Sequence, residues 1–286
     1  MERPAFSFET YGLEDLSNLR AEFDKNGFAV VKSVFSSSEI EEMRQRMMKL
    51  VSEMNPREHP RSVFTTYDQQ KHATDIYFLE SSDKIRFFYE EGAFDAEGHL
   101  VVPKELALNK VGHALHWLDD VFKKYTFSPK IKKIVNALHL EQPEVVQSMY
   151  IFKQPKIGGA VNDHIDATFV YVEPSDHLVG FWIAIDDADL SNGCLSFIPG
   201  PQKADAISYR FKRTHATEGL LLRFEGETPV YNRSDYVNVP VEKGSVVLIH
   251  GCVAHKSVAN LSTKPRHSYT FHVVESKGTT YSDDNW

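Results

Sequence analysis

The sequence has very little cysteine: Cys194 and Cys252 are the only two among 286 residues. Two cysteines cannot build the multi-disulfide framework of small secreted domains, so the sequence favours a reducing compartment. It also contains no apolar run close to the roughly 18 residues that a membrane-spanning helix needs. Basic residues are not in excess either, since the net charge is −8, and this argues against a nucleic-acid-binding protein.

Targeting patterns are not visible at either end. The first residues, Met-Glu-Arg-Pro-Ala-Phe, do not show the basic and then apolar segments of a secretory signal. The last residues, Ser-Asp-Asp-Asn-Trp, differ from a peroxisomal signal of the Ser-Lys-Leu type. We therefore expect a cytoplasmic protein that binds neither a membrane nor a nucleic acid.

The composition that is present is that of a globular protein, with 42% hydrophobic and 25% charged residues. The chain has no evident internal repeat or low-complexity tract. We predict a single domain over residues 1–286, in which a helix-rich part up to about residue 140 packs on a β-rich part, residues 141–286.

Helical patterns dominate the first half. Residues 13–26 predict a helix, and residues 27–35, GFAVVKSVF, predict a strand. Ser36 and Glu39 have the spacing of a capping box, in which each side chain binds the backbone N–H of the other residue. The helix that follows should bury residues spaced three and four apart, namely Ile40, Met43, Met47, Leu50 and Met54.

Two more helices and a loop complete this half. Apolar residues recur at helical spacing through residues 106–125, and Pro129 suits the first turn of a further helix. The polar stretch 55–72 contains two prolines and predicts a mobile loop. We expect this loop and residues 201–236 to border the mouth of a pocket.

From residue 144 onward the pattern becomes one of short strands. The β-rich runs are VVQSMYIFK, ATFVYVE, LVGFWIAIDD, GCLSFIPG, GSVVLIHG and RHSYTFHVV, and turn residues separate several of them. Such runs indicate an antiparallel sandwich or barrel rather than alternating strands and helices. The predicted fold class is therefore mainly β with helical additions.

One short motif in this half carries possible chemistry. His164 and Asp166 are two residues apart in a strand-like run, and residues i and i+2 of a strand point to the same face. Such a pair can bind one metal ion, or the two side chains can simply hydrogen-bond each other in the core. The motif alone is too short to choose between these interpretations.

A second histidine and an arginine favour a metal site. A 2-His-1-carboxylate triad needs a ligand from a second element, and His255, just after the apolar run GSVVLIHG, is the candidate. Arg266 follows eleven residues later, so a chain reversal would bring its guanidinium to the same cavity, where it would suit a dicarboxylate. Ser257 could add a hydroxyl on the same face. His250 is the main competitor, and we rank it below His255.

The other histidines receive no role. His267 and His272 are predicted to be surface or sheet-face residues. His113 and His116 are predicted to lie on the helix 106–125, near Lys110, and neither has a carboxylate at the spacing of a ligand pair.

Longer segments resemble a known family. The HID motif at 164–166, GFWIAIDDADLSNGCLSFIPG at 180–200 and HKSVANLSTKPR at 255–266 resemble the phytanoyl-CoA dioxygenase family of Fe(II)/2-oxoglutarate oxygenases. The similarity continues upstream through DKIRFFYEEGAFDAEG, NKVGHALH and VVQSMYIFKQP, so it covers nearly the whole chain. One departure is Pro201-Gln202, where relatives often have Ser-His after Pro-Gly.

The resemblance implies a double-stranded β-helix, that is, a cupin-like jelly roll. It also implies Fe(II), 2-oxoglutarate as co-substrate and O2, with ascorbate in a supporting role. By the family pattern, the residues that match are His164, Asp166 and His255 for the iron, Arg266 and Ser257 for the distal carboxylate of 2-oxoglutarate, and Lys110, Met149 and Trp182 for the rest of the co-substrate pocket.

The implied reaction is the oxidative decarboxylation of 2-oxoglutarate to succinate and CO2, coupled to hydroxylation of a small organic substrate that the sequence does not name. An aspartate at position 166 implies oxygenation rather than halogenation, because related halogenases have a small residue there. A catalytically silent jelly roll that binds a metal or a dicarboxylate, a purely structural module, and an epimerase or cyclase with the same cofactors remain open alternatives. The oligomeric state is also open.

Overall fold

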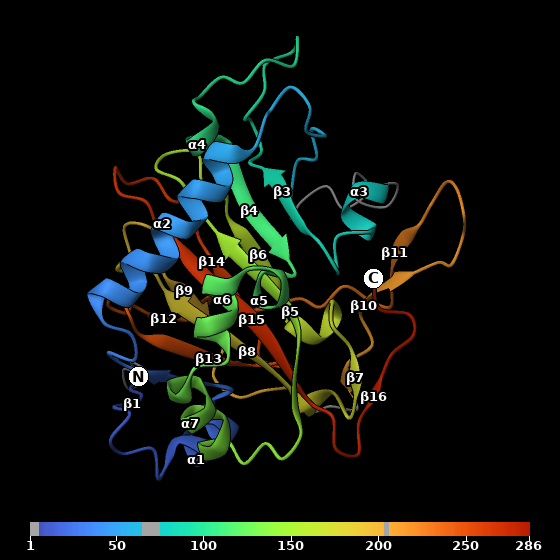
Figure 1. The fold of residues 1–286 in the computed structure, drawn as a ribbon. Coiled ribbons are helices and arrows are strands. Elements are labelled where there is room, and N and C mark those ends of the chain that lie inside the picture. The colour runs from blue at the N-terminus through green and yellow to red at the C-terminus, as the bar shows by residue number, and fades with distance from the viewer. Residues whose placement is uncertain (1–5, 65–74, 203–205) are drawn as a thin grey trace.

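The computed structural model describes residues 6–64, 75–202 and 206–286. Its largest element is an eight-stranded sheet in the order β1-β2-β13-β8-β15-β5-β4-β3 (Figure 1). Neighbouring strands pair antiparallel except β1 and β2, which are parallel. In sheet order the strands are β1 (Thr10–Tyr11), β2 (Phe28–Val31), β13 (Val246–His250), β8 (Leu178–Ala184), β15 (Ser268–Glu275), β5 (Pro143–Ile151), β4 (Leu108–His113) and β3 (Ile85–Tyr89).

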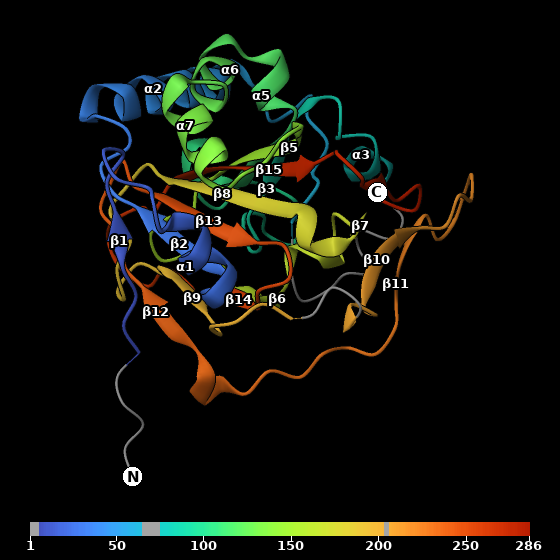
Figure 2. The same cartoon turned by 90° about the horizontal axis from the view of Figure 1, so that it is seen from below.

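A second, four-stranded sheet lies on one side of the large sheet, as Figure 2 shows. Its order is β12 (Val237–Val239), β9 (Leu195–Phe197), β14 (His255–Ser257) and β6 (Val161–His164), all antiparallel. Two strand pairs stand apart from both sheets: the hairpin of β10 (Arg210–Arg213) with β11 (Leu222–Glu225), and β7 (Val172–Glu173) with β16 (Thr280–Tyr281). Two facing antiparallel sheets confirm the predicted jelly-roll class.

Helices cover the other face of the large sheet (Figure 2). The main ones are α2 (Ser37–Glu53), α5 (Leu115–Leu118), α6 (Asp120–Thr126) and α7 (Pro129–Ala137), and the remaining helices are α1 (Leu19–Asn26), α3 (Ile76–Leu79) and α4 (Lys104–Ala107). Short 3-10 turns occur at Asp166–Thr168, Ser175–His177 and Arg233–Asp235. The strands β2, β13, β8 and β15 of the large sheet are thus buried throughout.

Strand β8 shows how this burial divides the core. All seven of its residues are buried, and they alternate between the two layers. Phe181 and Ile183 belong to the cluster formed with the helices, whereas Trp182 and Ala184 belong to the cluster formed with the small sheet. A strand that is covered on both sides has a continuous apolar sequence, and LVGFWIA is such a sequence. The functional residues lie on the second, inward side.

The first-half helices that the sequence predicts are partly confirmed. Helix α2 has the complete capping box, since Ser36 Oγ accepts from the Glu39 N–H at 3.3 Å and Glu39 Oε2 accepts from the Ser36 N–H at 2.7 Å. The predicted stripe of α2 faces the core, although Leu50 is only half-buried. Helix α7 begins at Pro129 as expected. Helix α1 covers only the end of the predicted segment 13–26.

Removing the cap of α2 should weaken the fold without touching the pocket. We expect Ser36→Ala to lower the free energy of unfolding by about 1 kcal/mol, because one hydrogen bond from the first turn is lost. Urea unfolding followed by circular dichroism measures this value. Ser52→Ala, in the last turn, is the control and should change stability by less than about 0.5 kcal/mol. Equal effects of the two substitutions would contradict the capping role.

The predicted helix over residues 106–125 is wrong in its first part. Residues 108–113 form strand β4, which pairs with β3 on one side and β5 on the other. Apolar residues at helical spacing here belong to three successive elements, and the sheet pairing overrides the apparent helical period. Lys110 and His113 are therefore on a buried strand, not on a helix, and only His116 is helical, in α5.

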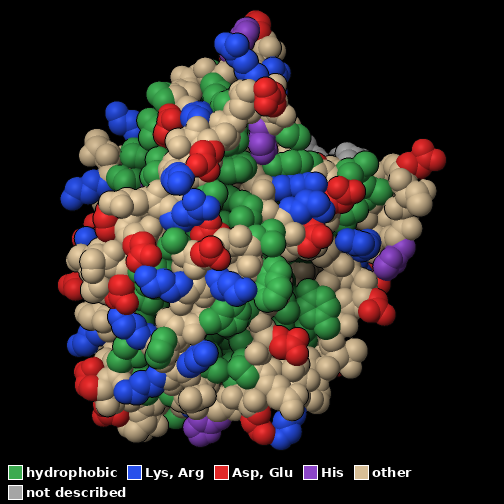
Figure 3. All heavy atoms as spheres, viewed as in Figure 1, with side chains coloured by type: hydrophobic (Ala, Val, Ile, Leu, Met, Phe, Trp, Pro, Cys, Tyr) green, Lys and Arg blue, Asp and Glu red, His purple; other side chains and the backbone are tan. Residues whose placement is uncertain are grey.

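The described surface agrees with the charge balance of the sequence. On the face shown in Figure 3, basic and acidic side chains are interspersed rather than gathered into one basic area. Within the described residues, no helix combines the length and the apolar character that crossing a lipid bilayer requires.

Candidate metal centre and co-substrate pocket

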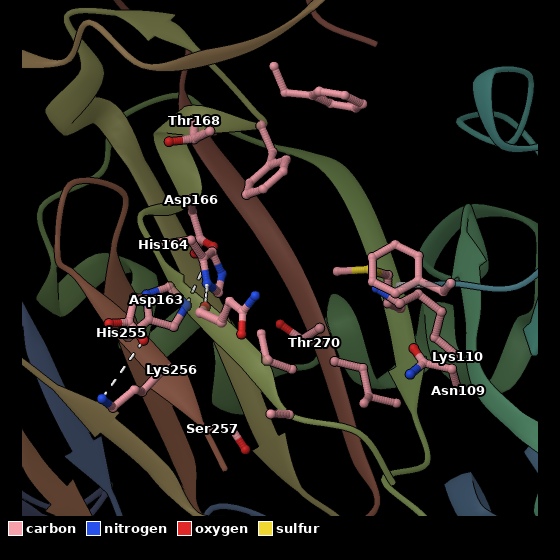
Figure 4. A pocket seen from close by; sticks show the side chains of 18 of the residues that line it. Asn109, Lys110, Asp163, His164, Asp166, Thr168, His255, Lys256, Ser257 and Thr270 are labelled. Atoms are coloured by element: carbon pink, nitrogen blue, oxygen red, sulfur yellow. Dashed lines mark hydrogen bonds and ion pairs between the residues drawn. The ribbon is translucent and has the colours of Figure 1, made fainter. Parts of the chain in front are cut away.

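A cavity of about 360 Å³ lies between the two sheets. The large sheet contributes inward side chains of β4, β5, β8 and β15, and the small sheet contributes β6, β9 and β14. Figure 4 shows His164, Asp166 and His255 together at one side of this pocket, Lys110 and Asn109 at the opposite side, and Thr270 between them. All eight residues that the sequence assigns to the site line this cavity.

The local structure of the HID motif differs from the prediction. His164 is the last residue of β6, but Asp166 already begins a 3-10 turn, and the predicted strand ATFVYVE is reduced to β7. The two side chains nevertheless approach each other, with His164 Nε2 3.6 Å from Asp166 Oδ1. A turn after the histidine, rather than strand alternation, brings the carboxylate to the same side.

The third member comes from the neighbouring strand. His255 on β14 pairs directly with His164 on β6, and the centres of the two imidazole rings are 4.2 Å apart. His255 Nε2 also lies 3.6 Å from Asp166 Oδ1. One nitrogen or oxygen atom from each of the three residues lies within 4.8 Å of the other two. Two imidazoles and one carboxylate at this separation form the donor set of a facial triad.

Both histidines are oriented by backbone carbonyl groups. His164 Nδ1 is 2.7 Å from the Asn162 carbonyl oxygen, and His255 Nδ1 is 3.0 Å from the Val253 carbonyl oxygen. A carbonyl oxygen only accepts, so each Nδ1 carries the hydrogen and each Nε2 keeps its lone pair. Those two Nε2 atoms face Asp166. The imidazoles are therefore held in the tautomer that binds a metal.

Electrostatics keep His255 and Asp166 in the protonation states that bind a metal. Burial lowers the pKa of His255 to about 4, with the nearby His164 as a further cause, so this imidazole is neutral at neutral pH. Burial opposes ionisation of Asp166, but His255 and His272 favour its charged form and hold its pKa well below the ordinary value. An ionised carboxylate buried beside the Nε2 atoms of His164 and His255 is a preformed cation site.

Arg266 lies buried in the same cavity, and no carboxylate of the described residues pairs with it. Its side chain is 1% exposed and its guanidinium carbon lies 5.2 Å from the centre of the Trp182 ring. Its hydrogen bond to Ser268 Oγ is long, at 3.5 Å, and its Nε has no partner among the described residues. Burial lowers the pKa of Arg266 to about 10. A buried guanidinium with unused donors fits a carboxylate ligand.

The remaining predicted pocket residues are present, and two of them differ from their sequence-based description. Lys110 is buried, its Nζ lies 3.2 Å from the centre of the Phe64 ring and 3.8 Å from Met149 Sδ, and burial lowers its pKa to about 7. Lys110 thus lies on a buried strand and not on the predicted helix. Ser257 Oγ donates to the Gly193 carbonyl oxygen at 2.8 Å, so its hydroxyl would have to turn to donate to a carboxylate.

Two of the other histidines, His250 and His272, differ in their position relative to the cavity. His250 Nδ1 accepts from the Cys252 N–H at 3.1 Å, its ring packs on Phe23, and it does not line the cavity. His272, predicted as a surface or sheet-face residue without a role, is buried with its Nε2 3.2 Å from Asp166 Oδ2. The sequence contained a pattern that indicates this position. Arg266 and His272 are an even number of residues apart along one extended segment, so their side chains point to the same face of the sheet.

Aromatic residues enclose the cavity beside the metal centre. They come from the loop before residue 65, from α3, from the turn after Asp166, from the hairpin β10–β11 and from the C-terminal residue: Phe64, Phe78, Phe169, Tyr209, Phe211, Phe224 and Trp286. The predicted contribution of residues 201–236 to the pocket is thus confirmed. Of the predicted loop 55–72, residues 65–72 lie outside the described residues.

Comparison with solved structures identifies the fold. The epimerase SnoN in complex with Fe3+, alpha ketoglutarate and nogalamycin RO superposes with a TM-score of 0.61 at 15% identity, over 93% of this chain and 85% of that one. EctD from S. alaskensis with 2-oxoglutarate and 5-hydroxyectoine gives a TM-score of 0.56 at 14% identity, over 90% and 75% of the chains. The fold is the double-stranded β-helix of these 2-oxoglutarate-dependent enzymes.

Sequence comparison then defines the family. The model of the phytanoyl-CoA dioxygenase (PhyH) family matches residues 23–268. Phytanoyl-CoA dioxygenase domain-containing protein 1 homolog of Caenorhabditis briggsae is 59% identical over 95% of both chains, and phytanoyl-CoA dioxygenase domain-containing protein 1 of Rattus norvegicus is 46% identical over 92% of this chain and 91% of the rat protein. The chain belongs to the phytanoyl-CoA dioxygenase family.

Proposed function

We propose that this protein is an Fe(II)- and 2-oxoglutarate-dependent dioxygenase that hydroxylates a small organic substrate. The observation that carries the proposal is the pairing of two buried sites in one cavity. His164, Asp166 and His255 form a metal donor set, and the buried guanidinium of Arg266 pairs with no carboxylate among the described residues. Each group is costly to bury alone, so each is best explained by a ligand.

The donor set fits ferrous iron. Two neutral imidazoles and a carboxylate that leave positions open are the ligands of non-haem Fe(II) oxygenases. Bound iron would supply the activation of O2 for oxidative decarboxylation of 2-oxoglutarate to succinate and CO2, with hydroxylation of the second substrate. SnoN, which shares this fold, forms a complex with Fe3+ and alpha ketoglutarate, and this supports the proposal.

The protein itself positions the reactants. Arg266 binds the distal carboxylate of 2-oxoglutarate and thereby selects the length of the keto acid, while Trp182 packs beside the guanidinium. Ser257, Met149 and Lys110 border the same cavity. The aromatic wall excludes water around the reacting atoms, which strengthens each charge interaction inside the pocket. No side chain of the chain needs to act as a general base.

The test is turnover of 2-oxoglutarate by the purified protein. With Fe(II), ascorbate and O2, we expect release of succinate, measured by mass spectrometry, and stimulation by compounds drawn from a small-molecule screen. A hydroxylated product that gains one oxygen atom from O2 supports hydroxylation, whereas a product isomeric with the substrate points to the epimerase alternative. Binding of Mn(II) and 2-oxoglutarate without any succinate would identify a silent binding protein instead.

A further inference from the structure

The two oxygen atoms of Asp166 have different surroundings. Oδ1 lies 3.6 Å from His164 Nε2 and 3.6 Å from His255 Nε2, so it faces the metal position. Oδ2 lies 3.2 Å from His272 Nε2. His272 is not part of the group of mutually close ligand atoms found among the described residues. It therefore contacts the carboxylate rather than the metal position.

Gly180 stands next to His272 and completes this environment. The two residues are directly paired across strands β15 and β8. A Cβ atom added at Gly180 would lie 3.1 Å from Asp166 Oδ2 and 3.2 Å from the Cβ of Ile249, which is closer than ordinary packing. The absence of a side chain thus lets the carboxylate rest against the backbone of the large sheet.

The hydrogen-bonding pattern assigns a direction to the His272 contact. A carboxylate oxygen only accepts, so the hydrogen of this contact belongs to His272 Nε2. His272 Nδ1 is buried and has no hydrogen-bond partner in the described part of the chain, so no other group binds a hydrogen on that nitrogen. His272 is thereby set to donate to Oδ2.

We propose that His272 and Gly180 form a seat for Asp166 Oδ2, which makes the carboxylate bind the metal through Oδ1 alone. This inference rests on the proposed function. A carboxylate that turned both oxygens to the metal would occupy one of the positions that 2-oxoglutarate and O2 need. His272 is thus a positioning residue: it acts through Asp166 and keeps a coordination position free. None of the three proposed metal ligands lies on the large sheet. Through His272 and Gly180, however, this sheet controls how the ligand Asp166 is oriented.

Mn(II) binding to the full chain tests the seat without relying on turnover. His272→Leu keeps the volume but cannot donate, so Oδ2 is free to coordinate. We expect Mn(II) affinity to fall by about tenfold or more, as for other groups that orient metal ligands. The number of exchangeable waters on Mn(II), from broadening of its electron paramagnetic resonance lines in oxygen-17 water, should fall from about three to about two.

Two more variants make the test specific. His272→Gln retains an N–H donor and should restore most of the affinity and the third water. Gly180→Ala should resemble His272→Leu, because the added methyl group presses on Oδ2. His250→Leu is the matched control, since it removes a buried histidine of the same sheet that has no contact with the centre, and thermal unfolding checks that each variant folds.

The seat is refuted if His272→Leu, while folded, binds Mn(II) within twofold of the wild-type affinity and keeps about three waters. It is also refuted if His272→Gln is as impaired as His272→Leu. Failure of the proposed function looks different, because wild-type protein would then either not bind Mn(II) or bind it without releasing succinate from 2-oxoglutarate. If wild-type protein binds Mn(II) and the His272 variants bind it equally well, only the role of His272 is excluded.

Discussion

Asp166→Ala is expected to abolish the turnover of 2-oxoglutarate and to weaken Mn(II) binding by more than about a hundredfold. The loss should exceed the 10- to 100-fold effect typical of groups that only orient metal ligands, because Asp166 provides the one charge of the donor set. Two neutral imidazoles alone offer little to a hard divalent cation. Calorimetric titration with Mn(II) and succinate assays measure the two effects.

Stability separates this prediction from simple unfolding. In the metal-free protein, Asp166→Ala leaves His272 Nε2 without its acceptor, and we expect a loss of about 1–3 kcal/mol, which is less than the whole stability of an ordinary domain. Asp176→Ala, an exposed carboxylate on the neighbouring 3-10 turn, is the control and should bind Mn(II) normally. Folded Asp166→Ala protein that still turned over 2-oxoglutarate would remove Asp166 from the metal centre.

Arg266→Leu is expected to raise the KM for 2-oxoglutarate by about 30-fold or more. Truncating one member of a buried charge pair costs about 2–5 kcal/mol, and 2 kcal/mol corresponds to a factor of about 30. Mn(II) binding in the absence of 2-oxoglutarate should stay at the wild-type value, because Arg266 is not among the ligands. Arg266→Lys should recover only part of the loss, since an ammonium cannot bind a carboxylate bidentately.

The same substitution should not destabilise the protein when 2-oxoglutarate is absent. Burial lowers the pKa of Arg266 to about 10, so at neutral pH the charged form is less favourable in the folded chain than in the unfolded chain. Replacing it with leucine removes that penalty. We expect an unchanged or higher melting temperature, measured by differential scanning fluorimetry. An unchanged KM would exclude Arg266 as the carboxylate anchor, and a sharply lower melting temperature would indicate a structural role instead.

Local patterns predicted much of the fold correctly where local forces decide it. The capping box at Ser36 and Glu39 and the proline at the start of α7 were sufficient, because the backbone groups involved lie within one helical turn. The prediction of a helix over residues 106–125 was wrong in its first part for the opposite reason. Strand β4 exists because β3 and β5 pair with it on both sides, and no local signal encodes partners that come from distant parts of the chain.

The sequence by itself determined which donor types are available: the HID motif, His255, Arg266 and the resemblance that groups them. Only the tertiary structure decided how these groups are used. It placed Asp166 on a turn instead of a strand, oriented both imidazoles through backbone carbonyls, and brought His272 and Gly180 against Asp166. The physical reason is that an atom-to-atom distance between sheets depends on register and packing, which no short stretch of sequence specifies.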